Sequence, residues 1–323
     1  MDGGKQAFGS GTEGNNIKNG KEADMDRVRR IVHAQTAYQE GFYGQGITTV
    51  VLDTGVYPHS DLRERILYFK DFVNRKKLPY DDCSHGTHVS GILCGSGKSS
   101  GGRFMGIAPK SKLIHLKVLD KRGNGNIADV IQGIDWCLKN REEYQIRIMN
   151  ISVGALAGQE SQKERLLIEW VEKAWDAGIV VVVAAGNMGP SEGSVTVPGN
   201  SKKVITVGSC DDHEAILHQN RMTAHYSGRG PTAECVCKPD ISAPGTNVVS
   251  CTAAGGKNYL YGRKSGTSMA TPVVSGCIAL MLSKYPDMTN VEVKMRLRES
   301  ATDAGLSRKQ QGWGRVDVER MMR

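Results

Sequence analysis

Four polar residues of this 323-residue chain could together carry out nucleophilic catalysis. Asp53 and Asn187 each follow an apolar run, His85 opens the segment HGTHVSG, and Ser268 lies in GTSMATP. A serine hydroxyl needs a base that removes its proton, and that base needs a carboxylate that fixes its tautomer. The oxyanion that forms when a carbonyl group is attacked needs hydrogen-bond donors, such as an asparagine amide. All four parts are present in one chain.

Each of the four also has an ordinary structural interpretation. An aspartate after a strand often forms a turn, and a serine before an apolar run often caps a helix. Asn187, in AAGN, could likewise belong to a plain turn. His88 follows His85 by three residues, so the pair could bind a metal from one helix face, but the glutamate of the zinc-protease motif is absent. Only the catalytic hypothesis accounts for the whole set at once.

The elements that must position these residues follow from the apolar pattern. Continuous β-branched runs are typical of strands buried in a parallel sheet, and we expect them at 47–53, 112–120, 146–153, 179–185 and 203–209. Helical spacing predicts helices at 86–94, 127–140, 161–177, 267–285 and 290–300. The alternation predicts the α/β class, with a doubly wound, mainly parallel central β-sheet flanked by helices on both faces. Ligands of such sheets bind beyond the carboxyl ends of the strands, where Asp53 and Asn187 stand.

The motif blocks around these residues resemble those of the subtilisin-like serine proteases, peptidase family S8. DTGV, HGTHVSG, AAGN and GTSMATP occur in that family's order, and similarity extends over residues 31 to 318. The likeness is strongest to the AprX-type bacterial subtilases that lack a signal peptide. The resemblance implies a serine endopeptidase that forms an acyl-enzyme on Ser268. In it, His85 would act as general base and acid, Asp53 would orient His85, and Asn187 would stabilise the oxyanion.

The resemblance also implies how a polypeptide substrate would bind. The substrate would pair as an added strand between two edges of the cleft, beside a pocket for the residue before the scissile bond. The edges would be formed by Ser152, Val153 and Gly154 and by Gly123, Asn124 and Gly125, and the pocket by Ala184, Ala185 and Gly186 with Thr196 near its base. Backbone pairing ignores side-chain identity, and the pocket carries no charge. We therefore expect broad specificity with an apolar or aromatic residue before the cut.

No cofactor is required for this chemistry, although a structural calcium ion is an open alternative. Asp61 matches an aspartate of the family's tight calcium site. The loop CGSGKSSGGRF, where the family usually supplies further ligands, has no carboxylate or amide side chain, so only its carbonyl groups could complete the site. Cys235 and Cys237 form a CxC pair without the second pair that a zinc site needs, so free thiols are the better interpretation.

Two glycine-rich segments imitate nucleotide-binding motifs. GSGKSS near residue 95 resembles a P-loop, but its first glycine is missing and a helix precedes it. GNGNIA, from Gly123, matches a dinucleotide fingerprint but lacks a following acidic residue for the ribose. A pseudoprotease that only binds would usually lack a member of the triad, and none is missing here. The chain has a net charge of +8, but its basic residues are scattered along the sequence. This pattern predicts a solvated basic surface and no nucleic-acid partner.

The ends of the chain and its cysteines suggest where the protein works. Residues 1–26 are polar and rich in glycine, so we expect a flexible extension there and one peptidase domain over 27–323. The start has no apolar stretch of signal-peptide length, and no segment approaches a membrane span, so we expect neither classical export nor membrane association. Several of the eight cysteines lie in apolar runs, which favours a reducing cytoplasm. Non-classical release and the oligomeric state stay open.

Overall fold

The computed structural model describes residues 25–152, 162–213, 216–218, 221–253 and 260–323. Within these residues a central sheet has the strand order β2-β3-β1-β4-β5-β6-β9, and all its neighbouring strands pair in parallel. The strands are β1 (Thr48–Asp53), β2 (Ile66–Asp71), β3 (Lys112–Lys117), β4 (Ile146–Ile151), β5 (Val180–Ala184), β6 (Ile205–Ser209) and β9 (Ile241–Ala243). The predicted fold class is therefore confirmed.

The apolar runs that predicted strands form the middle of this sheet. Strands β1, β5 and β6 are buried along their whole length, as expected for strands covered on both faces. The pattern did not predict β2 or β9. Strand β2 lies at an edge and buries only two of its six residues, Phe69 and Asp71, and β9 is only three residues long.

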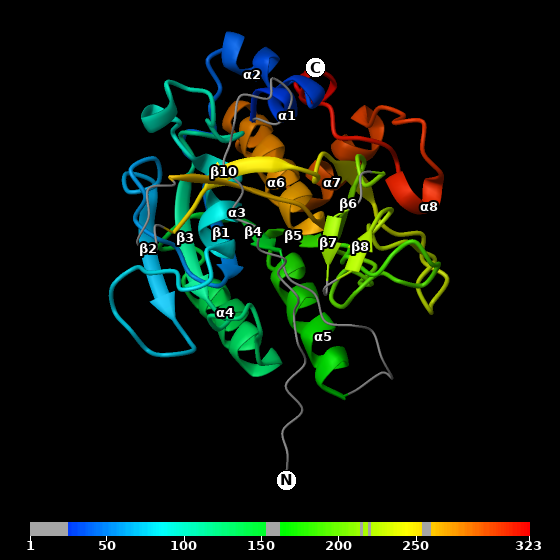
Figure 1. The fold of residues 1–323 in the computed structure, drawn as a ribbon, viewed down its shortest axis with the longest axis horizontal. Helices are drawn as coiled ribbons and strands as arrows, with labels where there is room; N and C mark the ends of the chain where they lie inside the picture. Colours follow the sequence, from blue (N-terminus) through cyan, green and yellow to red (C-terminus); the bar gives the residue numbers. More distant parts are fainter. Residues whose placement is uncertain (1–24, 153–161, 214–215, 219–220, 254–259) are drawn as a thin grey trace.

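Helices cover both faces of the sheet (Figure 1). Helices α3 (His85–Cys94) and α6 (Thr267–Lys284) lie on one face and pack against each other, and α4 (Ile127–Lys139) and α5 (Gln162–Asp176) lie together on the other. Nearly every residue of α6 from Thr267 to Leu282 is buried, because this helix crosses strands β4, β5, β6 and β9. Helix α7 (Asn290–Ser300) begins at a capping box formed by Thr289 and Glu292. The helices predicted from sequence are all present within one or two residues of their expected bounds.

The remaining elements are short and lie around this framework. They are α1 (Met25–Ile31), α2 (Gln35–Gln39), α8 (Arg308–Gln311), α9 (Val318–Met321), the 3₁₀ helix Lys98–Ser100, the hairpin of β7 (Ile216–His218) with β8 (Arg221–Thr223), and the pair β10 (Val248–Cys251) with β11 (Tyr261–Lys264). No helix in the described part of the chain has the length and apolar character that crossing a membrane requires.

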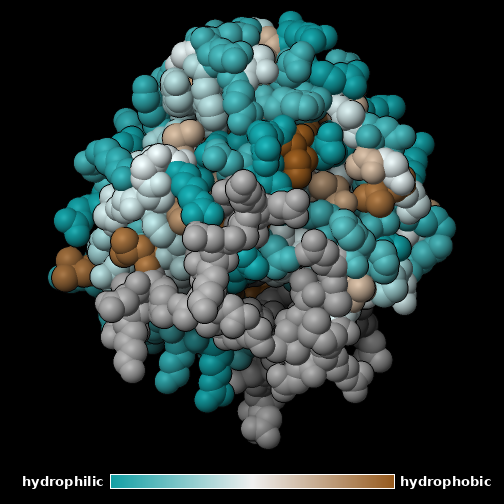
Figure 2. All heavy atoms as spheres, turned by 45° about the horizontal axis from the view of Figure 1, so that its top comes forward, coloured by the Kyte–Doolittle hydropathy of each residue, from teal (hydrophilic) through white to brown (hydrophobic). Residues whose placement is uncertain are grey.

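Large apolar side chains are mostly inside. One continuous apolar core joins both faces of the sheet to the helices that cover it. On the face drawn in Figure 2 the described surface is mainly hydrophilic, with hydrophobic residues in separate spots. Among the described residues, the exposed large apolar side chains are those of Leu67, Leu78, Leu166, Leu260, Val291 and Met295.

Candidate active site

The four candidate catalytic residues all stand at ends of the central elements. Asp53 is the last residue of β1, and Asn187 lies three residues after the end of β5. His85 is the first residue of α3, and Ser268 is the second residue of α6. Because β1, β4 and β5 are parallel neighbours, their carboxyl ends meet at one edge of the sheet.

Asp53 and His85 form a hydrogen-bonded pair. His85 Nδ1 lies 2.7 Å from Asp53 Oδ1, which also accepts a hydrogen bond from the backbone N–H of Thr54 at 2.7 Å. Burial alone would raise the pKa of the Asp53 carboxyl, but the charge of His85 and its hydrogen bond outweigh burial and leave that pKa below its usual value. Asp53 is thus a carboxylate that can only accept. The ring proton of neutral His85 therefore sits on Nδ1, and Nε2 is left as a base.

The hydroxyl of Ser268 has another partner in this structure. It donates to the carbonyl oxygen of Ser152, 2.6 Å away, just beyond the end of β4. The Ser152 side chain is buried and accepts a hydrogen bond from Asn150 Nδ2 at 2.8 Å. Asn150 Oδ1 in turn accepts from Ser275 Oγ of α6 at 2.9 Å, so β4 and the helix that carries Ser268 are tied together. Catalytic hydrogen bonds often form only when substrate is bound, so this orientation agrees with a nucleophilic role.

The amide of Asn187 has a fixed orientation. Asn187 Oδ1 accepts hydrogen bonds from the backbone N–H of Thr267 at 2.9 Å and from Thr267 Oγ1 at 3.1 Å. Thr267 Oγ1 also accepts from the backbone N–H of Gly186 at 3.1 Å. The oxygen of the amide is occupied, so its NH₂ group is the part that can donate to a ligand. Thr267 was not singled out from the sequence, because a threonine beside a candidate nucleophile carries no signal of this contact.

Gly266, which directly precedes Thr267 and Ser268, leaves room for the side-chain amide of Asn187. A Cβ atom added to Gly266 would lie 3.1 Å from Asn187 Nδ2, and the φ angle of Gly266 is +141°. Both observations favour glycine at this position. The nucleophile segment and Asn187 are thus in direct contact at the start of α6, where backbone N–H groups favour negative charge.

The proposed pocket residues come together beside Asn187. Thr196 donates from its backbone N–H to the carbonyl oxygen of Ala185 at 2.9 Å, and its Oγ1 donates to the same oxygen at 3.3 Å. A Cβ atom on Gly186 would lie 2.5 Å from Thr196 Cγ2, so the threonine side chain is packed directly against this glycine. Ala184 and Ala185 are buried. No charged side chain is found among these four residues.

The two expected substrate edges are only partly described. Asn124 lies in a tight turn, in which its carbonyl oxygen accepts from the backbone N–H of Asp120 at 2.8 Å and its own N–H donates to Asp120 Oδ1 at 2.9 Å. Gly123 lies in this turn, and Gly125 closes it by an antiparallel bridge to Leu119. On the facing edge Ser152 is described, whereas Val153 and Gly154 lie outside the described residues.

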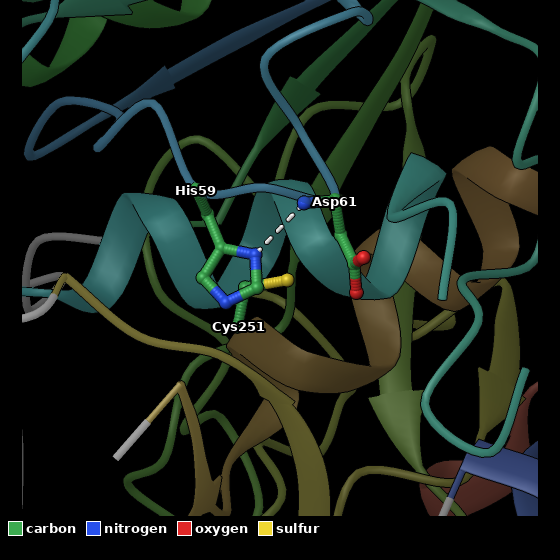
Figure 3. Close-up of side chains that lie close together, drawn as sticks. All are labelled: His59, Asp61 and Cys251. Carbon is green, nitrogen blue, oxygen red and sulfur yellow. Dashed lines mark hydrogen bonds between the residues drawn. The ribbon is translucent and has the colours of Figure 1, made fainter. Parts of the chain in front are cut away.

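Asp61 is part of a buried cluster with His59 and Cys251 (Figure 3). His59 Nδ1 accepts a hydrogen bond from the backbone N–H of Asp61 at 3.0 Å, so its lone pair is engaged. Burial raises the pKa of the Cys251 thiol well above its usual value, so this thiol stays protonated. A calcium ion selects oxygen ligands, and a nitrogen and a sulfur are the wrong neighbours for it.

The carboxylate of Asp61 is itself held by protein donors. Its Oδ1 accepts from the backbone N–H of Ser99 at 3.0 Å and from Ser96 Oγ at 3.3 Å, and its Oδ2 accepts from the Tyr261 hydroxyl at 2.6 Å. These three donors come from the loop after α3 and from β11. The residues present around Asp61 therefore do not fit a calcium ion.

Another buried histidine touches the site, and sequence reasoning missed it. His115, in the middle of β3, is fully buried. Its Nε2 accepts from the backbone N–H of Gly55 at 3.2 Å, and its Nδ1 lies 3.2 Å from Ser90 Oγ. Burial lowers the pKa of His115 to about 4, although the nearby charge of Asp53 acts in the opposite direction. The presence of this histidine within the largely apolar run KLIHLKV was the only feature of the sequence that pointed to it.

The profile of the Subtilase family matches residues 44–314, which include all four candidate catalytic residues. This chain belongs to the subtilase family. Serine protease AprX of Bacillus subtilis (strain 168) is 43% identical over 300 residues, which cover 87% of this chain and 67% of that protein. Subtilisin of Bacillus pumilus is 36% identical over 280 residues, covering 85% of this chain and 91% of that protein. The solved structure of Sphericase is similar with a TM-score of 0.72 and 31% identity, covering 85% of this chain and 92% of that one.

Family membership establishes the enzyme class of this subtilase. Its relatives are subtilisin-like serine proteases, so the chain is a hydrolase that acts on polypeptides by the mechanism of that family. The predicted family and activity are confirmed.

Proposed function

We propose that this subtilase is an endopeptidase in which Ser268 is the nucleophile, His85 the base and Asp53 the residue that orients His85. The observation that carries this proposal is the 2.7 Å hydrogen bond from His85 Nδ1 to Asp53 Oδ1 at the edge where α6 presents Ser268. His85 Nε2 takes the hydroxyl proton as Ser268 Oγ attacks the carbonyl carbon, and later gives it to the leaving amine. Water then hydrolyses the acyl-enzyme by the same route.

Asn187 supplies a donor to the oxyanion in this scheme. Its NH₂ group is available because Thr267 already occupies its oxygen. A donor that is fixed before the reaction stabilises the developing charge without having to reorganise. Thr267 is accordingly a positioning residue, and Asn187 is the group that touches the reacting atoms.

Substrate preference follows from the pocket beside Asn187. Ala184, Ala185 and Gly186 have small side chains or none, and Thr196, whose hydroxyl is bonded to Ala185, packs against Gly186. We expect the pocket that they line to accept an apolar or aromatic side chain. A charged side chain would find no partner among these residues and would be costly to bury. Together with backbone pairing at Ser152 and at 123–125, this supports broad cleavage with graded preferences.

The same proposal includes a reducing cytoplasm, no required cofactor and partners limited to polypeptides. Cys94, Cys137, Cys251 and Cys277 are buried, and burial raises the pKa of each thiol. Such thiols act as small apolar side chains and are slow to oxidise. Intact mass under non-reducing conditions should show eight free thiols, and two or more native disulfides would contradict the cytoplasmic location.

The experiment that tests the function compares the native chain with Ser268→Ala on a denatured protein. Products are identified by mass spectrometry, so one measurement reports activity, nucleophile and preference. We expect internal cuts after apolar or aromatic residues with the native chain only. Binding of the denatured protein without cleavage would instead indicate a pseudoprotease.

A further inference from the structure

A buried carboxylate lies between the two segments that carry Asp53 and His85. Asp81 stands four residues before His85 and pairs with Gly55 in an antiparallel bridge. Its residue exposure is only 9%, and it belongs to none of the groups assigned above. The two carboxylate oxygens of Asp81 together contact the turn after β1 and the start of α3.

Five hydrogen bonds to protein groups hold this carboxylate. Oδ1 accepts from Thr54 Oγ1 at 2.9 Å and from the backbone N–H groups of Cys83 at 3.0 Å and Ser84 at 2.9 Å. Oδ2 accepts from the backbone N–H of Thr87 at 2.9 Å and from Thr87 Oγ1 at 2.6 Å. Three of the five donors are backbone groups that cannot become acceptors. An amide in place of the carboxylate would direct its NH₂ group at donors.

Asp81 does the work of a helix cap for α3. The first N–H groups of a helix have no partner inside it, and Ser84, at the cap position, makes no capping hydrogen bond with its side chain. The N–H of Thr87 is instead bound by Asp81, and the N–H of Gly86 by Thr54 Oγ1 at 2.9 Å. The negative charge is also favourable at this end of a helix. The start of α3, and hence His85, is fixed from outside the helix.

Thr54 links the same carboxylate to Asp53. Its hydroxyl donates to Asp81, and its backbone N–H donates to Asp53 Oδ1 at 2.7 Å, the oxygen that binds His85. Asp53 and His85 are thus both held in place by Asp81, the first through Thr54 and the second through the first turn of α3. A displacement of either by a fraction of an ångström would lengthen that bond.

We propose that Asp81 is a positioning residue that sets the geometry of the Asp53–His85 pair, acting through Thr54 and the first turn of α3. This inference rests on the proposed function of that pair. Because misplacement of a catalytic group lowers the rate of the chemical step more than it weakens binding, the effect should fall on kcat.

The test compares the variant Asp81→Asn with the control variant Asp82→Asn. The control removes the negative charge of the neighbouring residue and leaves Asp81 in place. Asp82 is more exposed, and its Oδ1 accepts a hydrogen bond from the Lys117 ammonium, which also donates to the Thr54 carbonyl oxygen. Asparagine keeps an oxygen acceptor for Lys117, so Asp82→Asn removes the charge without removing this contact. For Asp81→Asn we expect kcat on a peptide substrate to fall by about 10- to 100-fold with KM nearly unchanged. The low-field NMR signal of the His85 Nδ1 proton should shift or broaden. Asp82→Asn should keep both the rate and the signal.

A second pair of variants keeps the inference testable if Asp81→Asn does not fold. Thr54→Val removes the hydroxyl link at nearly constant volume, and Thr54→Ser retains it. The valine variant should lose kcat and disturb the His85 signal, and the serine variant should restore both. Folded Asp81→Asn or Thr54→Val with native kcat and an unchanged signal would overturn the proposal, even if the melting temperature fell. Labelling of native Ser268 by a phosphonate, measured in parallel, shows whether the proposed function itself holds.

Discussion

The Ser268 hydroxyl donates a hydrogen bond to the Ser152 carbonyl oxygen at 2.6 Å, so its proton points toward the end of β4. Ser152 also begins the edge along which the substrate backbone is proposed to pair. A substrate bound along this edge would lie against the Ser152 carbonyl group, which accepts the hydrogen bond from the Ser268 hydroxyl. For the proposed reaction the Ser268 hydroxyl must leave this partner and donate to His85 Nε2.

The triad should act as one unit. Removing either Ser268 or His85 takes away the nucleophile or its base, so each single alanine variant should lower kcat by several orders of magnitude, as found for subtilisin. The double variant should be hardly worse than either single one. Steady-state kinetics on one peptide substrate checks this, and additive losses would show that the two residues act independently.

Asn187 should affect the chemical step rather than binding. In Asn187→Leu, kcat should fall by about 10²- to 10³-fold with little change in KM, the loss measured for the corresponding donor of subtilisin. Circular dichroism provides the control for folding. Thr267→Ser keeps the hydroxyl and backbone N–H that orient the amide, so it should remain active. Native turnover in a folded Asn187→Leu variant would exclude the oxyanion role.

The size of the residue at position 196 should set the depth of the pocket. Replacing Thr196 by glycine removes the side chain packed against Gly186, so cleavage after phenylalanine and tyrosine should rise relative to cleavage after leucine. The change should lie within about 1 to 3 kcal/mol of transition-state free energy. Thr196→Ser is the matched control, because it keeps the hydroxyl that binds Ala185. A peptide-library profile that does not change in Thr196→Gly would place the pocket elsewhere.

Much of this site follows from the sequence, because the buried strands β1 and β5 are continuous apolar runs and Asp53 and Asn187 lie at or just beyond their ends. Asp81 and Thr267 could not be found in this way. Their importance depends on contacts between segments far apart in the chain, and neither residue type is unusual where it stands. Asp61 shows the reverse case, since a matching motif suggested calcium and the neighbours do not fit it.

Buried His115 should make the fold sensitive to mild acid. Burial holds its pKa near 4 in the native state, whereas an unfolded histidine titrates near 6.5. Below about pH 6.5 the unfolded chain binds a proton that the native chain does not. The contribution of His115 to the free energy of unfolding should therefore be fully retained above pH 6.5 and decrease by up to about 1.4 kcal/mol per pH unit as the pH falls toward 4.

Denaturant titrations at several pH values measure this slope. In His115→Gln the slope of the unfolding free energy between pH 6.5 and 4 should be smaller by the contribution of one bound proton, up to about 1.4 kcal/mol per pH unit, whatever the variant's stability at pH 7. His213→Gln, at an exposed position, is the control for the replacement of a histidine by glutamine. Equal slopes in the native chain and His115→Gln would mean that His115 is protonated in the folded state.

Labelling with an active-serine phosphonate tests the central claim most directly, because the reagent reacts only with a serine that a working base and oxyanion site activate. The native chain should gain one adduct, which peptide mapping locates on Ser268. Ser268→Ala should gain none, and His85→Ala should react far more slowly than the native chain. An adduct on another residue, or labelling that persists in Ser268→Ala, would contradict the assignment of the nucleophile.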